Sequence, residues 1–208
     1  MERQRKMKIG ILGAGNVGGN LGRLWAARGH EIVFGVRDPN GDKIRALFGT
    51  IGGSARAASI REAAAFGEAV ALAVPWAVVP ETLAQTGDWA GKILIDSTNR
   101  FTAGRAASGA EEIAGLAPGA RVVKAFNTIG AELLASPRFD TQSATMFICG
   151  DDAQAKSVVA SLAEELGFEV VDAGPLSSAG MLESLARLWV SLSRGGLGRN
   201  IAFKLLRR

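Results

Sequence analysis

The chain has 208 residues, 48% of them apolar, and its 24 Lys and Arg against 20 Asp and Glu give a formal charge of +4. This length allows one domain with a real core and a modest appendage, and it excludes a second full enzyme domain. With no tyrosine and one histidine, the chain lacks the Tyr–Lys pair of short-chain dehydrogenases and has little to offer mechanisms based on phenol or imidazole proton carriers.

The sequence gives no sign of a secreted or membrane-bound protein. Cys149 is the single cysteine, so no internal disulfide is possible. The basic start MERQRKMK has no following signal-type apolar run, and the longest apolar stretch, 69–80, is shorter than the ~20 residues that span a bilayer. Although the pI is about 9.6, the basic residues are scattered. We therefore expect a cytoplasmic protein without membrane or nucleic-acid partners.

Short apolar runs alternate with helical patterns along the chain, which is typical of a parallel sheet covered by helices on both faces. The patterns predict strands at 8–12, 31–36, 54–57, 69–74, 92–96, 121–125, 145–149 and 168–172. They predict helices at 16–28, 42–48, 59–66 and 78–86, and further helices that begin near 108, 152 and 178. Two of these helices open on a capping box, formed by Ser59 with Glu62 and by Ser108 with Glu111. The prediction is an α/β fold of Rossmann type, with a doubly wound, mainly parallel sheet and a short C-terminal helical extension.

We interpret residues 1–208 as one NAD(P)-binding domain, with a core at about 7–172 and the extension at about 173–208. Four apolar residues of the extension have helical spacing: Leu182, Leu185, Trp189 and Leu192. Such a stripe must be covered, and we expect it to pack in the core or to form the contact of a homodimer. A membrane-surface helix is the alternative, which the break at 195–196 disfavours.

The first predicted turn carries a phosphate-binding pattern. Gly13, Gly15 and Gly18 have the G-x-G-x-x-G spacing directly after a predicted strand and at the start of a predicted helix. The first glycine permits the tight turn, the second lets the backbone approach a pyrophosphate, and the third allows close packing of helix on strand. Amides at the helix N-terminus then face the phosphates. The pattern predicts a dinucleotide site, and a purely structural turn is the alternative.

The residue at the end of the second strand distinguishes NAD from NADP. An acidic residue there binds the ribose 2′-hydroxyl, whereas an arginine pairs with a 2′-phosphate. Arg37 occupies this place and Lys43 can add a second cation, while Asp38 offers a ribose acceptor. The balance favours NADP(H), with NAD as the alternative.

Three later loops converge on the same sheet edge, because ligands of open α/β sheets bind outside the carboxyl ends of the strands. Val74 and Pro75 are expected beside the nicotinamide. The predicted acceptor pocket consists of Pro75, Trp76, Asn99, Asn127 and Thr128. These amide, hydroxyl and ring groups can orient two flat rings. We assign no certain catalytic residue and expect no metal site.

Other candidate residues have a structural explanation beside the chemical one. Asp96 is either an acid–base group or the cap of the turn that follows it. Lys124 is either a general acid or a lysine whose amine reaches solvent at the sheet edge. Trp76 either stacks on a bound ring or packs half-buried, and Cys149 reads as a buried apolar residue.

The assembled motifs resemble the NADP oxidoreductase, coenzyme F420-dependent family. The resemblance rests on GILGAGNVGGNLGRLWAARGHEIVFGVRDP, ALAVPW, KAFNTIG, CGDD and DAGPLSSAGMLESLA. DSTNRF and KAFNT are also similar to the cytosolic oxidoreductase domain of the STEAP metalloreductases. The resemblance implies that Arg37 holds the 2′-phosphate and that the pyrophosphate is held by Gly13, Ala14, Gly15, Asn16 and Val17. This chain has Val36 where the family typically has serine, and Asn127 where F420 reductases have histidine.

The resulting expectation is an NADPH-dependent oxidoreductase that transfers a hydride between NADP(H) and coenzyme F420 or a flavin such as FMN or FAD. Reduction of a small carbonyl or imine is one alternative, although the residues after 172 are too few for the long helical domain that such enzymes add. A non-catalytic module that senses NADP is the other alternative.

Overall fold

The computed structural model describes residues 5–51, 55–101 and 108–208, apart from the side chain of Lys43, and the statements below refer to this part of the chain. Lys43 is predicted to bind the cofactor, and its side chain therefore lies outside what the structure describes. Residue 54 of the third predicted strand also lies outside.

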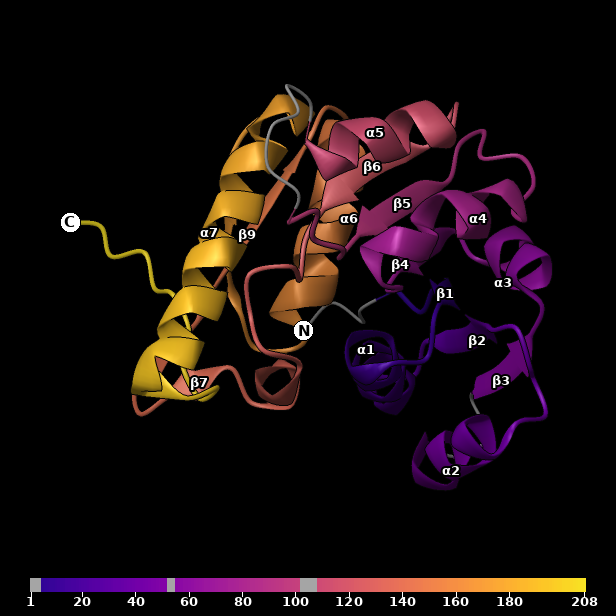
Figure 1. The fold of residues 1–208 in the computed structure, drawn as a ribbon, viewed down its shortest axis with the longest axis horizontal. Helices are drawn as coiled ribbons and strands as arrows, with labels where there is room; N and C mark the ends of the chain where they lie inside the picture. The colour runs from indigo at the N-terminus through magenta and orange to yellow at the C-terminus, as the bar shows by residue number, and fades with distance from the viewer. Residues whose placement is uncertain (1–4, 52–54, 102–107) are drawn as a thin grey trace.

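One sheet of eight strands runs through the molecule in the order β10-β9-β6-β5-β4-β1-β2-β3 (Figure 1). Strands β1 to β6 are mutually parallel in the order 3-2-1-4-5-6, which is that of a Rossmann sheet. The strands are β1 Lys8–Leu12, β2 Glu31–Gly35, β3 Ala55–Ala58, β4 Ala69–Leu72, β5 Ile93–Asp96, β6 Arg121–Lys124, β9 Thr145–Gly150 and β10 Glu169–Asp172. The predicted fold class is confirmed.

Helices cover both faces of the sheet. They are α1 Asn16–Ala27, α2 Asp42–Ile51, α3 Ile60–Phe66, α4 Val79–Ala84, α5 Gly109–Leu116, α6 Ala153–Glu164 and α7 Ala179–Leu192. One buried cluster includes Trp25 of α1 and Leu162 of α6. A second cluster, on the opposite face, joins α3, α4, α5 and α7, with Leu83 and Leu182 among its members. The sheet is therefore doubly wound.

Local capping fixes where two of these helices begin. The Ser59 hydroxyl accepts a hydrogen bond from the Glu62 amide at 3.2 Å, and the Glu62 carboxylate accepts one from the Ser59 amide at 2.9 Å. Ser108 and Glu111 repeat this reciprocal pair at the start of α5. Both predicted capping boxes are confirmed, and each satisfies backbone donors that the first helical turn leaves free.

Strand β9 runs antiparallel to β6, and β10 runs parallel to β9. The cause is the connection after β6, which contains a 3-10 turn at Ala131–Ala135 and a small hairpin of β7 Arg138–Phe139 and β8 Gln142–Ser143. The sequence prediction contains none of these three elements. Because the connection has no crossover helix to return it to the opposite end of the sheet, the next strand starts at the carboxyl end and runs back.

The C-terminal extension is helical only in part. After α7 and a wide turn at Ser193–Leu197, the chain continues without regular structure, and the carbonyl of Phe203 accepts a hydrogen bond from the Thr145 amide at 2.9 Å. Of the predicted apolar stripe, Leu182 and Trp189 are buried in the monomer, whereas Leu185 and Leu192 are half-buried.

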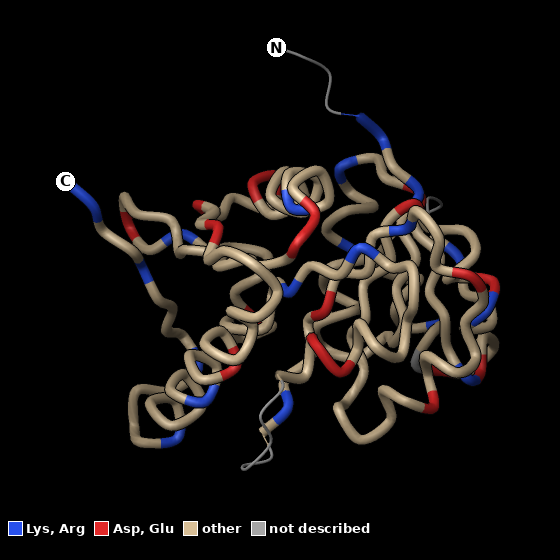
Figure 2. Tube along the Cα trace, turned by 90° about the horizontal axis from the view of Figure 1, so that it is seen from above, with Lys and Arg blue, Asp and Glu red and all other residues tan. Residues whose placement is uncertain are grey.

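Charged residues are spread over the trace, with acidic residues among the basic ones (Figure 2). Within the described ranges, no helix combines the length and the apolar character needed to cross a membrane.

Candidate functional site

Two adjoining cavities lie at the carboxyl ends of the parallel strands. The first, of about 780 Å³, extends from the ends of β1 and β2 to α4. The second, of about 690 Å³, lies beyond the ends of β4 and β5. They share four lining residues: Gly15, Ala73, Val74 and Pro75. Because β1 and β4 are neighbours, the shared wall stands at the point where the strand order reverses, where such sheets bind ligands.

The three glycines of the glycine-rich turn differ in how much space surrounds them. Gly13 has a φ of +103°, and an added Cβ would stand 2.6 Å from the carbonyl oxygen of Ala73. At Gly18 an added Cβ would lie 2.1 Å from the Gly13 carbonyl oxygen. Gly15 differs, because no atom lies within 4 Å of the position its Cβ would take. The turn therefore needs two glycines for its own packing and leaves the third open to both cavities.

The start of α1 is suited to a bound phosphate. Gly15 is the N-cap residue, and no side chain caps this end of the helix. The first amides of a helix of 12 residues thus have no side-chain acceptor and stand beside open space. The space above Gly15 and the uncapped amides fit the pyrophosphate of a dinucleotide.

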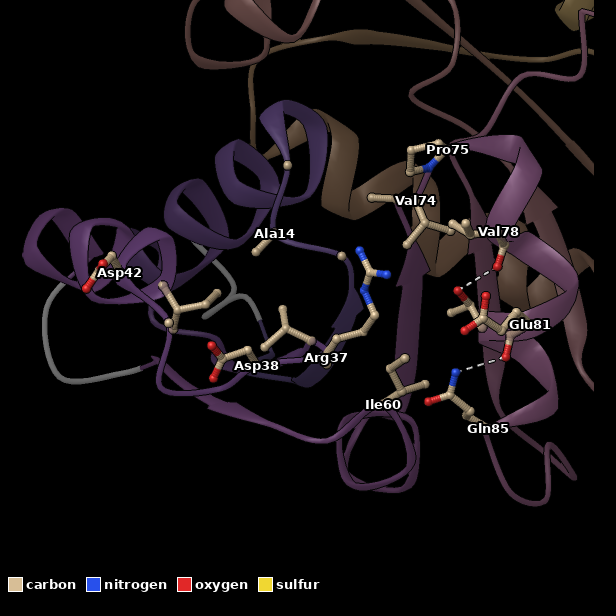
Figure 3. Close-up of a pocket in the computed structure, with 18 residues that line it drawn as sticks. Ala14, Arg37, Asp38, Asp42, Ile60, Val74, Pro75, Val78, Glu81 and Gln85 are labelled. Carbon is tan, nitrogen blue, oxygen red and sulfur yellow. Dashed lines mark hydrogen bonds between the residues drawn. The ribbon is translucent and has the colours of Figure 1, made fainter.

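Arg37, two residues after the end of β2, is exposed and lines the first cavity (Figure 3). In the described part of the chain it forms neither a hydrogen bond nor an ion pair, so its guanidinium can pair with a ligand anion. Two neighbouring carboxylates are already engaged. Asp38 accepts a hydrogen bond from the Asn40 amide at 3.1 Å, and Asp42 forms an ion pair with Arg45 at 2.5 Å.

The opposite wall of the first cavity comes from Ile60 and from one face of the α4 segment, with Val78, Glu81 and Gln85 (Figure 3). The site prediction omits this wall. A signal does exist in the sequence, because positions 78, 81 and 85 are three and four residues apart and therefore share one helical face.

The second cavity is mainly apolar and includes three of the five residues predicted for the acceptor pocket. Pro75, Trp76 and Asn99 line it, together with Phe101, which is 51% exposed. Trp76 is half-buried, and the Arg100 guanidinium lies 5.9 Å from its ring centroid. Of the residues predicted to bind the cofactor, Asn16 and Val17 also line this cavity.

Asn127 and Thr128 are buried and belong to the lining of neither cavity. Asn127 instead holds a residue that does line one. Its Nδ2 donates to Asn99 Oδ1 at 2.9 Å, and Asn99 Nδ2 donates to the Asn127 carbonyl at the same distance. Phe126 before it has a φ of +61°, a strained conformation for a side chain of this size. Asn127 thus acts on the cavity through Asn99.

A buried ionic cluster contacts the loop after β5, which carries Asn99, through Thr98. Lys124 Nζ lies 2.7 Å from Asp96 Oδ2 and 3.2 Å from Glu183 Oε1, and it donates to the Thr98 carbonyl at 3.0 Å. Asp96 Oδ1 accepts hydrogen bonds from the amide and hydroxyl of Thr98. Asp96 therefore does cap the turn after β5. The interpretation of Lys124 as a lysine reaching solvent is wrong, because its side chain is fully buried and paired.

Two further titratable residues, Cys149 and His30, lie outside the linings of both cavities. Burial raises the pKa of the Cys149 thiol to about 11, in agreement with its interpretation as an apolar residue. His30 Nδ1 accepts a hydrogen bond from the Met7 amide, and His30 Nε2 lies 2.7 Å from a Glu165 carboxylate oxygen. Met7 and His30 immediately precede β1 and β2, so this contact lies at the amino ends of the strands.

Together, the Rossmann sheet, the open glycine turn, the unpaired arginine after β2 and the two adjoining cavities are the features of a dinucleotide-binding protein.

Comparison with known proteins narrows this class. The model of the family "NADP oxidoreductase coenzyme F420-dependent" matches residues 8–100. A crystal structure from Arthrobacter sp. FB24, provisionally named an F420-dependent NADP-reductase, superposes with a TM-score of 0.88 and 32% identity, over 97% of this chain and 100% of that one. This chain belongs to the coenzyme F420-dependent NADP oxidoreductase family. Membership supports NADP(H) as its cofactor.

Other similar proteins have longer chains. The metalloreductase STEAP3 of Rattus norvegicus is 34% identical over 182 residues, which are 86% of this chain and 36% of that protein. The chain thus spans about a third of the length of that relative. A reductive aminase of Aspergillus terreus in complex with NADPH has a TM-score of 0.71 at 22% identity, covering 92% of this chain and 64% of that one. This last similarity concerns the fold alone.

Proposed function

We propose that this protein transfers a hydride between NADP(H) and a flat redox ring, either coenzyme F420 or a flavin such as FMN or FAD. The observation that carries the proposal is the second cavity. It is mainly apolar, it shares Val74 and Pro75 with the first cavity, and none of the described residues that line it is titratable. Hydride transfer between two stacked rings needs alignment rather than a side-chain acid or base, and this cavity supplies alignment.

The residues of the first cavity divide the work of binding. Backbone groups of 13–17 hold the pyrophosphate, and Arg37 pairs with the 2′-phosphate. Bound NADPH supplies the hydride. Val74 and Pro75, at the shared wall, place the reactive ring of the cofactor against the second cavity. Because no protein carboxylate pairs with Arg37 in the described structure, its guanidinium is available for the 2′-phosphate that distinguishes NADP(H) from NAD(H).

The second cavity determines the acceptor. Trp76 and Phe101 offer aromatic surface, on which a flat ring system can stack. Asn99 offers an amide that Asn127 holds in place by two hydrogen bonds of 2.9 Å, so its orientation is set before the ligand binds. This combination suits a planar ring with polar groups along one edge.

An anaerobic stopped-flow experiment tests the proposal. NADPH or NADH is mixed with the protein and with F420, FMN or FAD in separate reactions, and the oxidation of the nicotinamide is followed by its absorbance. We expect turnover with at least one acceptor and faster turnover with NADPH than with NADH. Turnover with none of the three acceptors would refute the proposal. In Arg37→Gln, we expect the preference for NADPH to fall by about ten-fold or more.

We also propose that the protein forms a homodimer through the outer face of α7. Met181 and Leu188 are 69% and 48% exposed, and with the half-buried Leu185 and Leu192 they form a stripe spaced by four, three and four residues. This spacing is typical of a helix–helix seam. Light scattering after size exclusion should give a dimer for the native chain and a monomer for Leu188→Glu. A monomeric native chain would contradict the proposal.

A further inference from the structure

The first cavity contains one unpaired cation and one unpaired anion on opposite walls. Arg37 projects from the end of β2 and Glu81 from α4, and both side chains line the cavity (Figure 3). The two side chains do not form an ion pair with each other, and neither side chain has another hydrogen-bond or ion-pair partner within the described ranges. The other carboxylates of this cavity, Asp38 and Asp42, already have protein partners. Among the carboxylates that line this cavity, Glu81 is the one whose side chain has no protein partner within the described ranges.

The position of Glu81 in its helix does not require this orientation. A carboxylate in the first turn of α4 stabilises the helix through the helix dipole, whichever way its side chain points around the helix axis. Here it lies on the helical face that also carries Val78 and Gln85 toward the cavity. The backbone carbonyl of Glu81 accepts a hydrogen bond from Gln85 Nε2 at 3.1 Å, which keeps the Gln85 side chain along the same wall.

The chemistry of the cofactor determines which of its groups Glu81 can meet. A carboxylate repels phosphates, so it cannot serve the pyrophosphate or the 2′-phosphate. The ribose that carries the 2′-phosphate carries the adenine on the adjacent carbon, so the base must lie close to Arg37. Ile60 and Val78 give this part of the cavity apolar surface for a flat base. The adenine amino group is a hydrogen-bond donor, and a carboxylate accepts.

We propose that Glu81 accepts a hydrogen bond from the exocyclic amino group of adenine, and that it makes the site selective for adenine over a 6-oxopurine. The inference rests on the proposed function, because it assumes that NADP(H) occupies the first cavity. Hypoxanthine has a carbonyl oxygen in place of the amino group. Opposite Glu81 this places two acceptors face to face, and a site built for a donor rejects a ligand that lacks it.

The test compares NADPH with its analogue in which hypoxanthine replaces adenine. Isothermal titration gives the Kd of each for the native chain and for Glu81→Gln. We expect the native chain to bind the analogue about ten-fold more weakly. A glutamine amide can accept from the amino group or donate to the carbonyl, so the two Kd values of Glu81→Gln should agree within about two-fold. The ratio is the readout, because removing a negative charge near the phosphates can strengthen both complexes.

Asp42→Asn is the matched control, because it removes one carboxylate from the same cavity, but one that already has an ion-pair partner in Arg45. It should keep the native ratio, and thermal unfolding of each variant verifies that it is folded. Equal binding of both dinucleotides by the native chain, or an unchanged ratio in Glu81→Gln, would overturn the inference while leaving the proposed function intact. A native chain that binds neither dinucleotide would refute the proposed function and the inference with it.

Discussion

Two glycines of the phosphate turn, Gly15 and Gly18, should respond to alanine in opposite ways. In Gly15→Ala the new methyl group meets no atom of the protein within 4 Å, and the backbone φ of −77° is one that alanine adopts readily. The expected cost to folding is at most about 1 kcal/mol, from the weaker N-cap. The methyl group nevertheless occupies the space through which a pyrophosphate reaches the backbone. We expect the Kd of NADPH to rise by about ten-fold or more.

Gly18→Ala should do the reverse. Its methyl group would stand 2.1 Å from the Gly13 carbonyl oxygen and 3.1 Å from Ala73 Cβ, so α1 must move away from the turn. Overpacking costs about 1–3 kcal/mol or more, against roughly 1 kcal/mol gained in helix propensity. A net loss of about 2 kcal/mol corresponds to a fall of about 4–8 °C in Tm for a chain of this size.

Thermal unfolding and titration with NADPH, on both variants side by side, give the four numbers needed. The reasoning predicts a stable Gly15→Ala that binds poorly and a Gly18→Ala whose main defect is stability. If Gly15→Ala binds NADPH as tightly as the native chain, the dinucleotide does not pass over Gly15, and the assignment of the turn is refuted.

Three further outcomes are expected. Lys124→Met leaves two carboxylates buried without their cation and should cost about 3–5 kcal/mol in urea unfolding, and a cost below about 1 kcal/mol would contradict the pairing. Ser108→Ala should cost about 1 kcal/mol at neutral pH. Hydrogen bonds from the backbone and side chain of Ser108 lower the pKa of Glu111. The stabilisation is therefore present above the unfolded pKa of this carboxyl group and is lost as the pH falls through its lower folded pKa. The stability difference between Ser108→Ala and the native chain should shrink in acid, and NMR follows the carboxyl titration. With its pKa raised to about 11, Cys149 should have about one thiolate in a thousand at pH 8 and react with a disulfide reagent only after unfolding.

The sequence predicts the parts of the fold that depend on neighbours in the chain. Capping boxes, apolar runs and glycine stops place every strand of the large sheet, because each signal acts within a few residues. The reversal of β9 has no such signal. It depends on how the chain from 125 to 144 packs, for instance on the hydrogen bond from Asn20 Nδ2 to the Ala131 carbonyl at 3.3 Å. Contacts over such separations are not visible in a local pattern.

The residues of the candidate site also differ in whether local sequence or distant contacts determine their position. The glycine turn and Arg37 follow from spacing and strand position alone, because backbone geometry and one strand end define them. The α4 wall depends on which face of a short helix turns inward. The inward position of Asn127 depends on its pairing with Asn99, which is 28 residues away in the sequence. A loop residue can therefore follow the end of a predicted strand and still be buried outside the lining of the cavity.

The extension after 172 belongs to the working unit, and we propose that 1–208 acts as one domain. Strand β9 begins at the carboxyl end of the sheet, and the chain that follows returns α7 to the face that α5 also covers. This placement delivers Glu183 to within 3.2 Å of Lys124, where its carboxylate also accepts a hydrogen bond from the Gly109 amide at 2.9 Å. The buried cluster that supports the loop of Asn99 therefore contains a residue from outside the predicted core. Because the proposed chemistry relies on alignment, we propose that α7 helps to align the acceptor through this cluster.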